Sequence, residues 1–268
     1  MKLVSAAKLR RAQEAAMGGR SFSERLGGVL ARVSADVPDG FSHPLLETRS
    51  EVKHRTVVLI SGERGLCGAY NSNVYKAVVA ELGRTKVPTD FVAIGRRSVA
   101  AAKSRNWNLK ASFEGLSEDA GTWPLSEMVD ALVADYVAGR SDEVVIFYTR
   151  FVSAMTQTVE REVLLPFAAE TSVASASTAE TSDAGAKYDP APEEIFARLI
   201  PLVIKTKVTQ AALESKASEH ASRMSAMDSA TRNADDLIDK LRLYYNRARQ
   251  SAITTELIDI VGGAEAQK

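Results

Sequence analysis

The sequence predicts an α/β protein in which a coiled-coil rod carries an inserted α/β domain. Two observations support this prediction. No glycine and no proline occurs between Leu202 and Val261, a stretch several times longer than the usual globular helix of about 12 residues. Between residues 51 and 168, in contrast, short β-branched runs alternate with helical patterns, as in a parallel sheet whose strands are joined by helices.

The glycine- and proline-free stretch has the apolar spacing of a coiled coil. Its apolar residues recur in steps of three and four that average about 3.5, the heptad period, rather than the 3.6 of a straight surface helix. Many of them are alanine, which lets a partner helix approach closely. Such a narrow seam needs a partner, which is either another helix of this chain or another protein. The seam comprises Ala217, Ala221, Met224, Met227, Ala230, Ala234, Ile238, Leu241, Tyr245, Ala248 and Ala252.

Polar residues flank the seam, and we expect them to face solvent. Three aspartates among them could indicate a cation site, but solvated charges on a polar helix edge are the favoured interpretation. The flanking residues are Lys216, Glu219, Ser222, Arg232, Asp235, Asp236, Asp239, Lys240 and Arg242.

The composition excludes several classes of protein. Lysine and arginine number 34, as do aspartate and glutamate, so no net charge favours nucleic acid or a membrane surface. The apolar runs fall far short of the ~20 residues that a membrane span needs. The basic start, Met1 to Ala16, lacks the apolar core of a secretory signal. One cysteine, Cys67, excludes an internal disulfide, and three scattered histidines show no metal-ligand spacing. We therefore expect no cofactor and no metal.

Residues 1–50 form the first segment, which is predicted to be helical from Met1 to about Leu30. Good helix formers and alanines at a spacing of three and four support this prediction. Its first 25 residues are rich in lysine and arginine, and two interpretations stay open: a solvated helix face, or a surface for an acidic partner. The Pro38-Asp39-Gly40 sequence ends the helix.

Residues 51–168 are predicted to form the α/β domain, with a mainly parallel sheet and right-handed crossovers. Its strands are expected at Thr56–Ser61, Asp90–Gly95, Glu143–Tyr148 and Thr156–Leu165. Its helices are expected at Arg97–Arg105, at Trp123–Val137, and after Asn71-Ser72, which would cap a helix with Val74, Val78 and Leu82 on its buried face.

The glycine-rich turn from Gly62 to Gly68 follows a strand and precedes a helix, where a phosphate-binding loop would lie. Its spacing fits neither of the common phosphate-binding patterns. We therefore expect a tight structural turn, with Cys67 as a small buried thiol rather than a reactive one beside Arg64.

Two further segments complete the chain. Residues 169–192 contain an Ala/Ser/Thr-rich stretch that is nearly free of large apolar side chains, and we expect a flexible linker or surface loop there. Residues 193–268 form the C-terminal helix, in which Pro201 predicts a kink or a helix start. The sequence as a whole contains no residue pattern that is typical of a catalytic site.

Four stretches resemble the gamma subunit of the F-type ATP synthase. Glu219–Ala234 (EHASRMSAMDSATRNA) and Tyr245–Ala264 (YNRARQSAITTELIDIVGGA) are similar to the C-terminal signature of that family. Met1–Gln13 resembles its first helix, and Arg64–Asn73 resembles the loop of its central domain. Together they span almost the whole chain in the family's order.

This resemblance implies a non-catalytic rotor shaft. The N- and C-terminal helices would form a long antiparallel coiled coil inside a ring of three alpha and three beta subunits. The inserted Rossmann-like domain would bind the epsilon subunit and the c-subunit ring, and proton flow would turn the shaft to drive ATP synthesis in the beta subunits. Contacts with the alpha/beta ring are expected at Met1, Lys2, Arg223, Arg249, Gln250, Thr254 and Glu256. Contacts with the c ring or epsilon are expected at Tyr188 and Asp189.

The resemblance also implies a cellular location, and the sequence departs from the family's pattern in two respects. We expect the cytoplasmic face of a bacterial plasma membrane, with the matrix face of the mitochondrial inner membrane as the alternative. Members of this family usually begin upstream of the position of Met1. The cysteine-bearing insertion of photosynthetic members is missing, so thiol control is not expected.

Two other hypotheses compete with the rotor. An enzyme built on the Rossmann-like domain would bind nucleotide by itself, which the unmatched phosphate loop disfavours. A homodimeric scaffold would carry larger residues than alanine along its seam.

Overall fold

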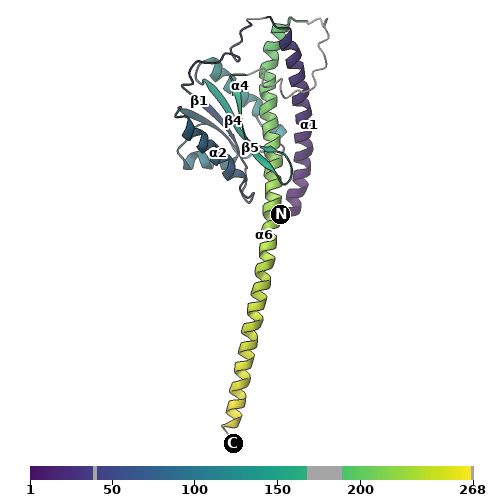
Figure 1. Cartoon of the computed structure of the whole chain (residues 1–268), viewed down its shortest axis with the longest axis vertical. Helices are drawn as coiled ribbons and strands as arrows, with labels where there is room; N and C mark the ends of the chain where they lie inside the picture. The colour runs from purple at the N-terminus through teal and green to yellow at the C-terminus, as the bar shows by residue number, and fades with distance from the viewer. Residues whose placement is uncertain (39–40, 168–188, 267–268) are drawn as a thin grey trace. The chain divides into compact units, whose positions relative to one another are not determined.

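The computed structural model describes residues 1–38, 41–167 and 189–266. These residues form two compact units, Met1–Ser225 and Ala226–Lys268. The first unit contains a five-stranded sheet and two long helices (Figure 1). The second unit is the C-terminal part of α6 (Pro192–Glu265), so this helix contributes to both.

The sheet has the order β3-β2-β1-β4-β5. The first four strands in this order are parallel, and β5 runs antiparallel to β4, so the prediction of a mainly parallel sheet is confirmed. The central strand β1 is buried at every residue, because helices cover both faces of the sheet. The strands are β1 (Arg55–Ile60), β2 (Thr89–Ile94), β3 (Asn108–Phe113), β4 (Glu143–Phe151) and β5 (Gln157–Leu165).

Two apolar clusters lie on opposite faces of the sheet. On one face, Val74 and Val78 of α2 (Tyr70–Arg84) pack on Val57 and its neighbours, as the sequence predicts. On the other face, α4 (Leu125–Val137) packs together with parts of α1 (Lys2–Ala35) and α6. The helix α3 (Arg96–Ser104) and the short 3₁₀ helix η1 (Ala120–Thr122) lie between these elements in the chain.

Helices α1 and α6 run antiparallel beside the sheet (Figure 1). Near the start of α1, Leu9 packs with Ala217 and Ala221 of α6. Further along α1, the carbonyl of Ala16 accepts a hydrogen bond of 3.1 Å from Gln210. Residue numbers therefore rise on one helix as they fall on the other, which confirms the predicted antiparallel pairing.

The predicted seam finds its partner helix only in part. Ala217 and Ala221 are fully buried against α1, and Met224 packs beside them. From Ser229 to Ala266, in contrast, every residue is exposed. The apolar seam positions in this exposed range include Ile238, Leu241 and Tyr245, which are 45, 57 and 65 % exposed.

Two local predictions are wrong, and the structure excludes one of the two outcomes expected at Pro201, which were a kink or a helix start. Strand β3, an edge strand in which half-buried and exposed residues alternate, is not among the predicted strands. Asn71 does not cap α2, since its side-chain oxygen accepts the backbone N–H of Gly62 at 2.9 Å. Pro201 does not start a helix: α6 begins at Pro192, where the missing proline N–H has no cost, and continues through Pro201.

The expected linker from Ala168 to Lys187 lies outside the described residues. Over the described ranges, none of the helices combines the length and the hydropathy needed to cross a bilayer.

Candidate functional site

Residues 214–221 of α6 are buried without a break. A helix on a protein surface normally buries one stripe and exposes the rest. Here successive residues point in all directions around the helix, so the helix is enclosed on every side. Most of these side chains are polar, including Ser218 at 0 % and Glu219 at 3 % exposure. We call residues 214–223 the collar segment, since Ser222 and Arg223 extend the same contacts.

One side of the collar segment is hydrogen-bonded to β4 and to the loop that follows β1. Ser215 Oγ accepts the N–H of Thr149 in β4 at 3.3 Å, and Ser218 Oγ donates to the carbonyl of Thr149 at 3.1 Å. Ser222 Oγ donates to the carbonyl of Cys67, in the loop after β1, at 2.7 Å. Tyr70 OH donates to the carbonyl of Ser215 at 3.1 Å. The helix is therefore joined to β4 and to the loop that follows β1.

These contacts lie near the point of the sheet where ligands usually bind. In open sheets with parallel strands, ligands bind outside the carboxyl ends of the strands where the strand order reverses. Here that point lies between β1 and β4, since β2 and β3 extend the sheet on one side and β5 on the other. The collar segment contacts the residues around it.

The loop after β1 is held by hydrogen bonds of its own. Asn71 Nδ2 lies 3.1 Å from Cys67 Sγ, while its oxygen holds Gly62. Cys67 is 2 % exposed, and its burial raises the pKa of the thiol, although the positive charge of Arg223 acts in the opposite direction. The predicted burial of the Cys67 thiol is thus confirmed.

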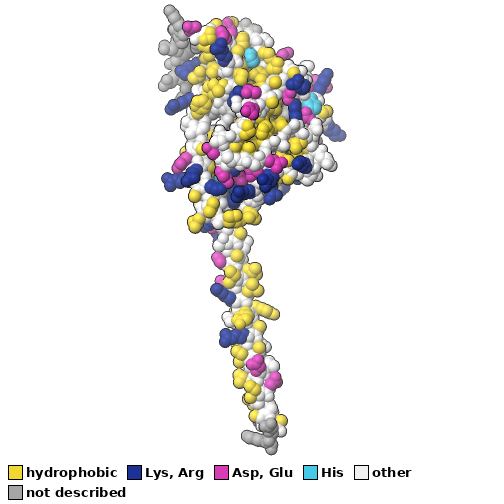
Figure 2. Space-filling model, turned by 180° about the vertical axis from the view of Figure 1, so that it is seen from behind, with side chains coloured by type: hydrophobic (Ala, Val, Ile, Leu, Met, Phe, Trp, Pro, Cys, Tyr) yellow, Lys and Arg dark blue, Asp and Glu magenta, His cyan; other side chains and the backbone are white. Residues whose placement is uncertain are grey.

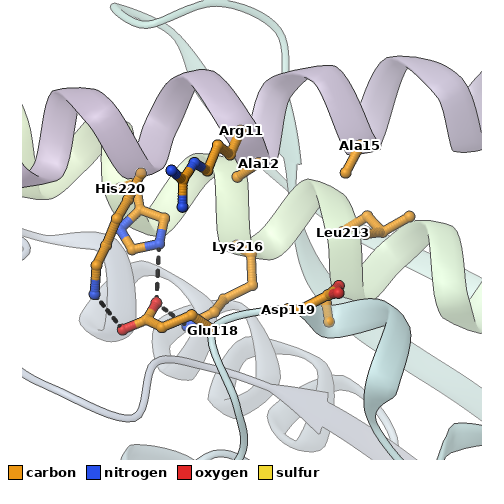
Figure 3. A pocket seen from close by; sticks show the side chains of 10 residues that line it. Arg11, Ala12, Ala15, Glu118, Asp119, Leu213, Lys216 and His220 are labelled. Carbon is orange, nitrogen blue, oxygen red and sulfur yellow. Dashed lines mark hydrogen bonds and ion pairs between the residues drawn. The ribbon is translucent and has the colours of Figure 1, made fainter.

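A second side of the collar segment faces the loop before η1, through Glu118. Glu118 Oε1 accepts a hydrogen bond of 2.7 Å from Lys8 Nζ of α1. Its other oxygen lies 3.3 Å from Lys216 Nζ and 3.2 Å from His220 Nε2, both on α6. Figure 3 shows Glu118 directed toward Lys216 and His220, at the edge of a cavity of about 470 Å³. One carboxylate therefore links both long helices to the α/β domain.

The charges around Glu118 set its protonation. Desolvation by itself would raise the pKa of Glu118, but the hydrogen bond from Lys8 and the positive charge of Lys216 lower this pKa to about 2. Burial lowers the pKa of His220, so the ring is neutral at pH 7. Because Arg223 Nη1 lies 3.3 Å from His220 Nδ1 and can only donate, the proton of the neutral ring lies on Nε2, toward Glu118.

The Glu118→Gln variant is expected to lose stability in a pH-dependent manner. The pKa of Glu118 falls from 4.5 to about 2 on folding, so its contribution is fully present above pH 4.5 and disappears as the pH falls toward 2. Urea denaturation of both proteins between pH 7 and pH 2.5 measures the difference in unfolding free energy. A difference that persists unchanged at pH 2.5 would contradict the assignment. The same experiment with Lys8→Ala and the double variant measures how much of the effect passes through Lys8.

The third side of the collar segment is α1, whose small and apolar residues Leu9, Ala12 and Ala16 pack on Ala217 and Ala221. Further along α1, a Cβ at Gly19 would lie 2.3 Å from the oxygen at the end of the flexible Gln210 side chain.

Comparisons with known proteins agree with this architecture. The family model described as ATP synthase matches residues 1–267. The ATP synthase gamma chain of Heliobacterium modesticaldum is 41 % identical over 269 residues, which cover 99 % of this chain and 91 % of the relative. The chain belongs to the ATP synthase gamma-chain family. A second bacterial gamma chain, from Desulforamulus reducens, is 42 % identical over 266 residues, with 99 % and 91 % covered.

Solved structures show the same fold as this gamma-chain family member. A chain from the mitochondrial ATP synthase central stalk and c ring of Tetrahymena thermophila superposes with a TM-score of 0.65 at 24 % identity, covering 86 % of this chain and 97 % of that chain. A chain from the Euglena gracilis mitochondrial ATP synthase has a TM-score of 0.57 at 19 % identity, with 98 % and 95 % covered. The predicted fold, terminal helices with an inserted α/β domain, is confirmed.

The residues that the gamma-chain resemblance selects fall in both compact units. Arg223 is 8 % exposed and lies in the collar segment, where it donates to Glu219 Oε1 at 2.5 Å and to the carbonyl of Gly65 at 3.4 Å. Met1 and Lys2 are exposed at the start of α1. Asp189 is exposed before α6, and Tyr188 lies outside the described residues. The exposed part of α6 carries Arg249, Gln250, Thr254 and Glu256.

Most of the collar segment is not predicted from the sequence. Lys216 and Glu219 were expected to face solvent, and this prediction is wrong: they are 5 % and 3 % exposed because the α/β domain packs over them. The expectation holds for Asp235 and Lys240, which are exposed. The spacing of Ser215, Ser218 and Ser222 places them on one face of a helix, but serine alone does not reveal what that face contacts.

Proposed function

We propose that this chain is the central rotor shaft of a proton-translocating F-type ATP synthase. One observation supports this role above all, namely the apolar side chains that recur along an exposed helix after Ser229. Figure 2 shows them along the C-terminal part of α6. Leu237, Leu241 and Leu257 are each 56 or 57 % exposed. Recurring exposed apolar side chains mark a surface that a partner covers, and family membership indicates which partner.

The partner proposed for this surface is the ring of alpha and beta subunits. Arg249, Gln250, Thr254 and Glu256 would make hydrogen bonds and ion pairs with the beta-subunit loops that break and re-form at each step, with Met1 and Lys2 as further contacts. Arg223 already has partners inside its own chain, so in this proposal it acts chiefly through the collar segment.

The α/β domain would bind the epsilon subunit and the c-subunit ring, with Tyr188 and Asp189 on the c-ring side. Membrane association would then arise through the complex, at the cytoplasmic face of a bacterial plasma membrane. The chain would be non-catalytic, and the beta subunits would carry out ATP synthesis. The contacts of the collar segment with β4 and with the loop after β1, where a nucleotide would bind in an open parallel sheet, support this proposal over the enzyme hypothesis.

Reconstitution tests the proposed function. The purified chain is mixed with alpha and beta subunits of a bacterial ATP synthase, and the stoichiometry and the rate of ATP hydrolysis are measured. One chain per ring of three alpha and three beta subunits, with stimulated hydrolysis, is the expected result. No assembly, together with nucleotide bound by the chain alone, would favour the enzyme hypothesis.

Single variants then test the contact residues. Exposed charged pairs contribute about 0.2–1 kcal/mol, so Arg249→Ala or Glu256→Ala should each lower the stimulated rate by up to about fivefold. Lys240→Ala, exposed on the same helix, serves as the matched control. An equal loss in the control and in both variants would contradict the assignment of these residues.

A further inference from the structure

We propose that the collar segment is the joint that carries torque between the α/β domain and the helix pair. This inference rests on the rotor function proposed above and names the residues that would transmit the torque. A shaft is useful only if the domain at one level cannot turn independently of the helices that emerge from it. The structure should therefore contain contacts that fix the angle of α6 about its own axis.

Apolar packing fixes such an angle poorly, because the hydrophobic effect is non-directional and depends chiefly on the area buried. Hydrogen bonds do fix it, because they weaken steeply as the donor angle closes. Around the collar segment the enclosing contacts are mainly of this directional kind. A buried helix that needed only stability would ordinarily carry apolar residues at these positions.

The serine hydrogen bonds hold α6 from one side. Ser215 and Ser218 bind both backbone groups of Thr149, one as acceptor and the other as donor. Ser222 binds the carbonyl of Cys67. These three serines lie on one face of the helix, since they are three and four residues apart. Turning α6 in either direction would lengthen these bonds.

Ion pairs hold the other sides. Lys216 and His220, one turn apart on the next face, both contact Glu118. At the start of the collar segment, Glu214 Oε1 accepts a hydrogen bond of 2.8 Å from Arg20 of α1, and Arg20 also donates to the carbonyl of Phe151 at 3.3 Å. The sheet, the Glu118 loop and α1 are thus all bonded to the same short length of α6.

The experiment compares the parent complex with a triple variant, Ser215→Ala, Ser218→Ala and Ser222→Ala. Each substitution removes a hydroxyl and retains the helix. A bead is attached to the α/β domain through Lys103→Cys, an exposed position on α3; the native Cys67 is buried and does not compete for the label. With the ring immobilised and rotation stopped by withdrawing ATP, the angular fluctuation of the bead reports the stiffness of the joint.

We expect the variance of the bead angle to rise by about half or more in the triple variant, since roughly three of the eight directional contacts described for the collar segment are lost. In vesicles that contain the whole complex, ATP-driven proton pumping should fall several-fold per ATP hydrolysed. Ser225→Ala is the matched control, because Ser225 lies on the same helix and is exposed. It should change neither quantity.

Two further outcomes keep the proposal and the proposed function distinguishable. A folded, assembled triple variant with unchanged variance and unchanged pumping would overturn the joint while leaving the rotor role intact. Failure of the parent chain to rotate would overturn the rotor role itself. If the triple variant does not fold, Ser222→Ala decides, because Ser222 is only half-buried. It should soften the joint, whereas Ser222→Thr, which retains the hydroxyl, should not.

Discussion

Ending the chain at Ser225 is expected to leave the α/β domain folded and to abolish ATP-driven proton pumping. The first compact unit ends at this residue. All three apolar clusters consist of residues that precede it. Every residue from Ser229 to Ala266 is exposed, so removing this part of α6 takes little packing away from the core.

Thermal unfolding and vesicle assays check the two halves of this prediction. The melting temperature of the shortened chain should stay within about 2 °C of the full chain, since a loss of 1 kcal/mol shifts a domain of this size by roughly 2–4 °C. The shortened chain should also be more soluble, because exposed apolar side chains such as Ile258 and Ile260 are removed. A large fall in melting temperature, or retained pumping, would contradict the prediction.

Gly95→Ala is expected to be among the most destabilising single substitutions in the chain. Gly95 follows β2 with a φ of +94°, a conformation that residues with a Cβ rarely adopt. A Cβ there would also lie 2.3 Å from the carbonyl oxygen of Ser61, a backbone atom that cannot rotate away. The N–H of Gly95 bonds the carbonyl of Phe113 at 2.8 Å, so a shift of Gly95 would disturb β3 as well.

We expect the substitution to cost about 3 kcal/mol or more of unfolding free energy, since backbone strain alone costs about 1–3 kcal/mol. Urea denaturation measures it. The matched control is Gly83→Ala, in α2, where no atom lies within 4 Å of the added Cβ. That substitution should stabilise the chain by about 0.5–1 kcal/mol, because glycine is a poor helix former. Equal effects at both positions would show that the steric argument is wrong.

The sequence predicts those helices that bury one apolar face, because their apolar residues then recur every three or four positions. The seam at Ala217 and Ala221 and the apolar face of α2 are of this kind. Strand β3 escaped prediction because an edge strand has half-buried residues in place of a continuous apolar run. Pro201 does not start the helix, because Phe196 and Ile200, which precede it in α6, are anchored in the core.

The collar segment could not be predicted for a different reason. A lysine or a glutamate on a long helix usually faces water, and local sequence does not reveal that an inserted domain folds back over it. Lys216 is buried because Glu118, about a hundred positions earlier, closes over it, and Glu219 is buried beside Gly62, in the loop that follows β1. The Asn71 prediction failed in the same manner, since the partner of its side chain is a loop residue rather than the helix terminus.

The serine contacts with β4 and with the loop after β1 also determine whether the α/β domain can be stable without the collar segment. A segment tethered within the same chain binds at an effective concentration of about millimolar or above. A free ligand of equal affinity would have to exceed this concentration to compete, so the helix behaves as a permanent, covalently supplied ligand. A fragment that contained the sheet without residues 214–223 would expose the backbone of Thr149 and the hydroxyl of Tyr70 to water. Such a fragment should regain its native stability when a peptide of that sequence is added back.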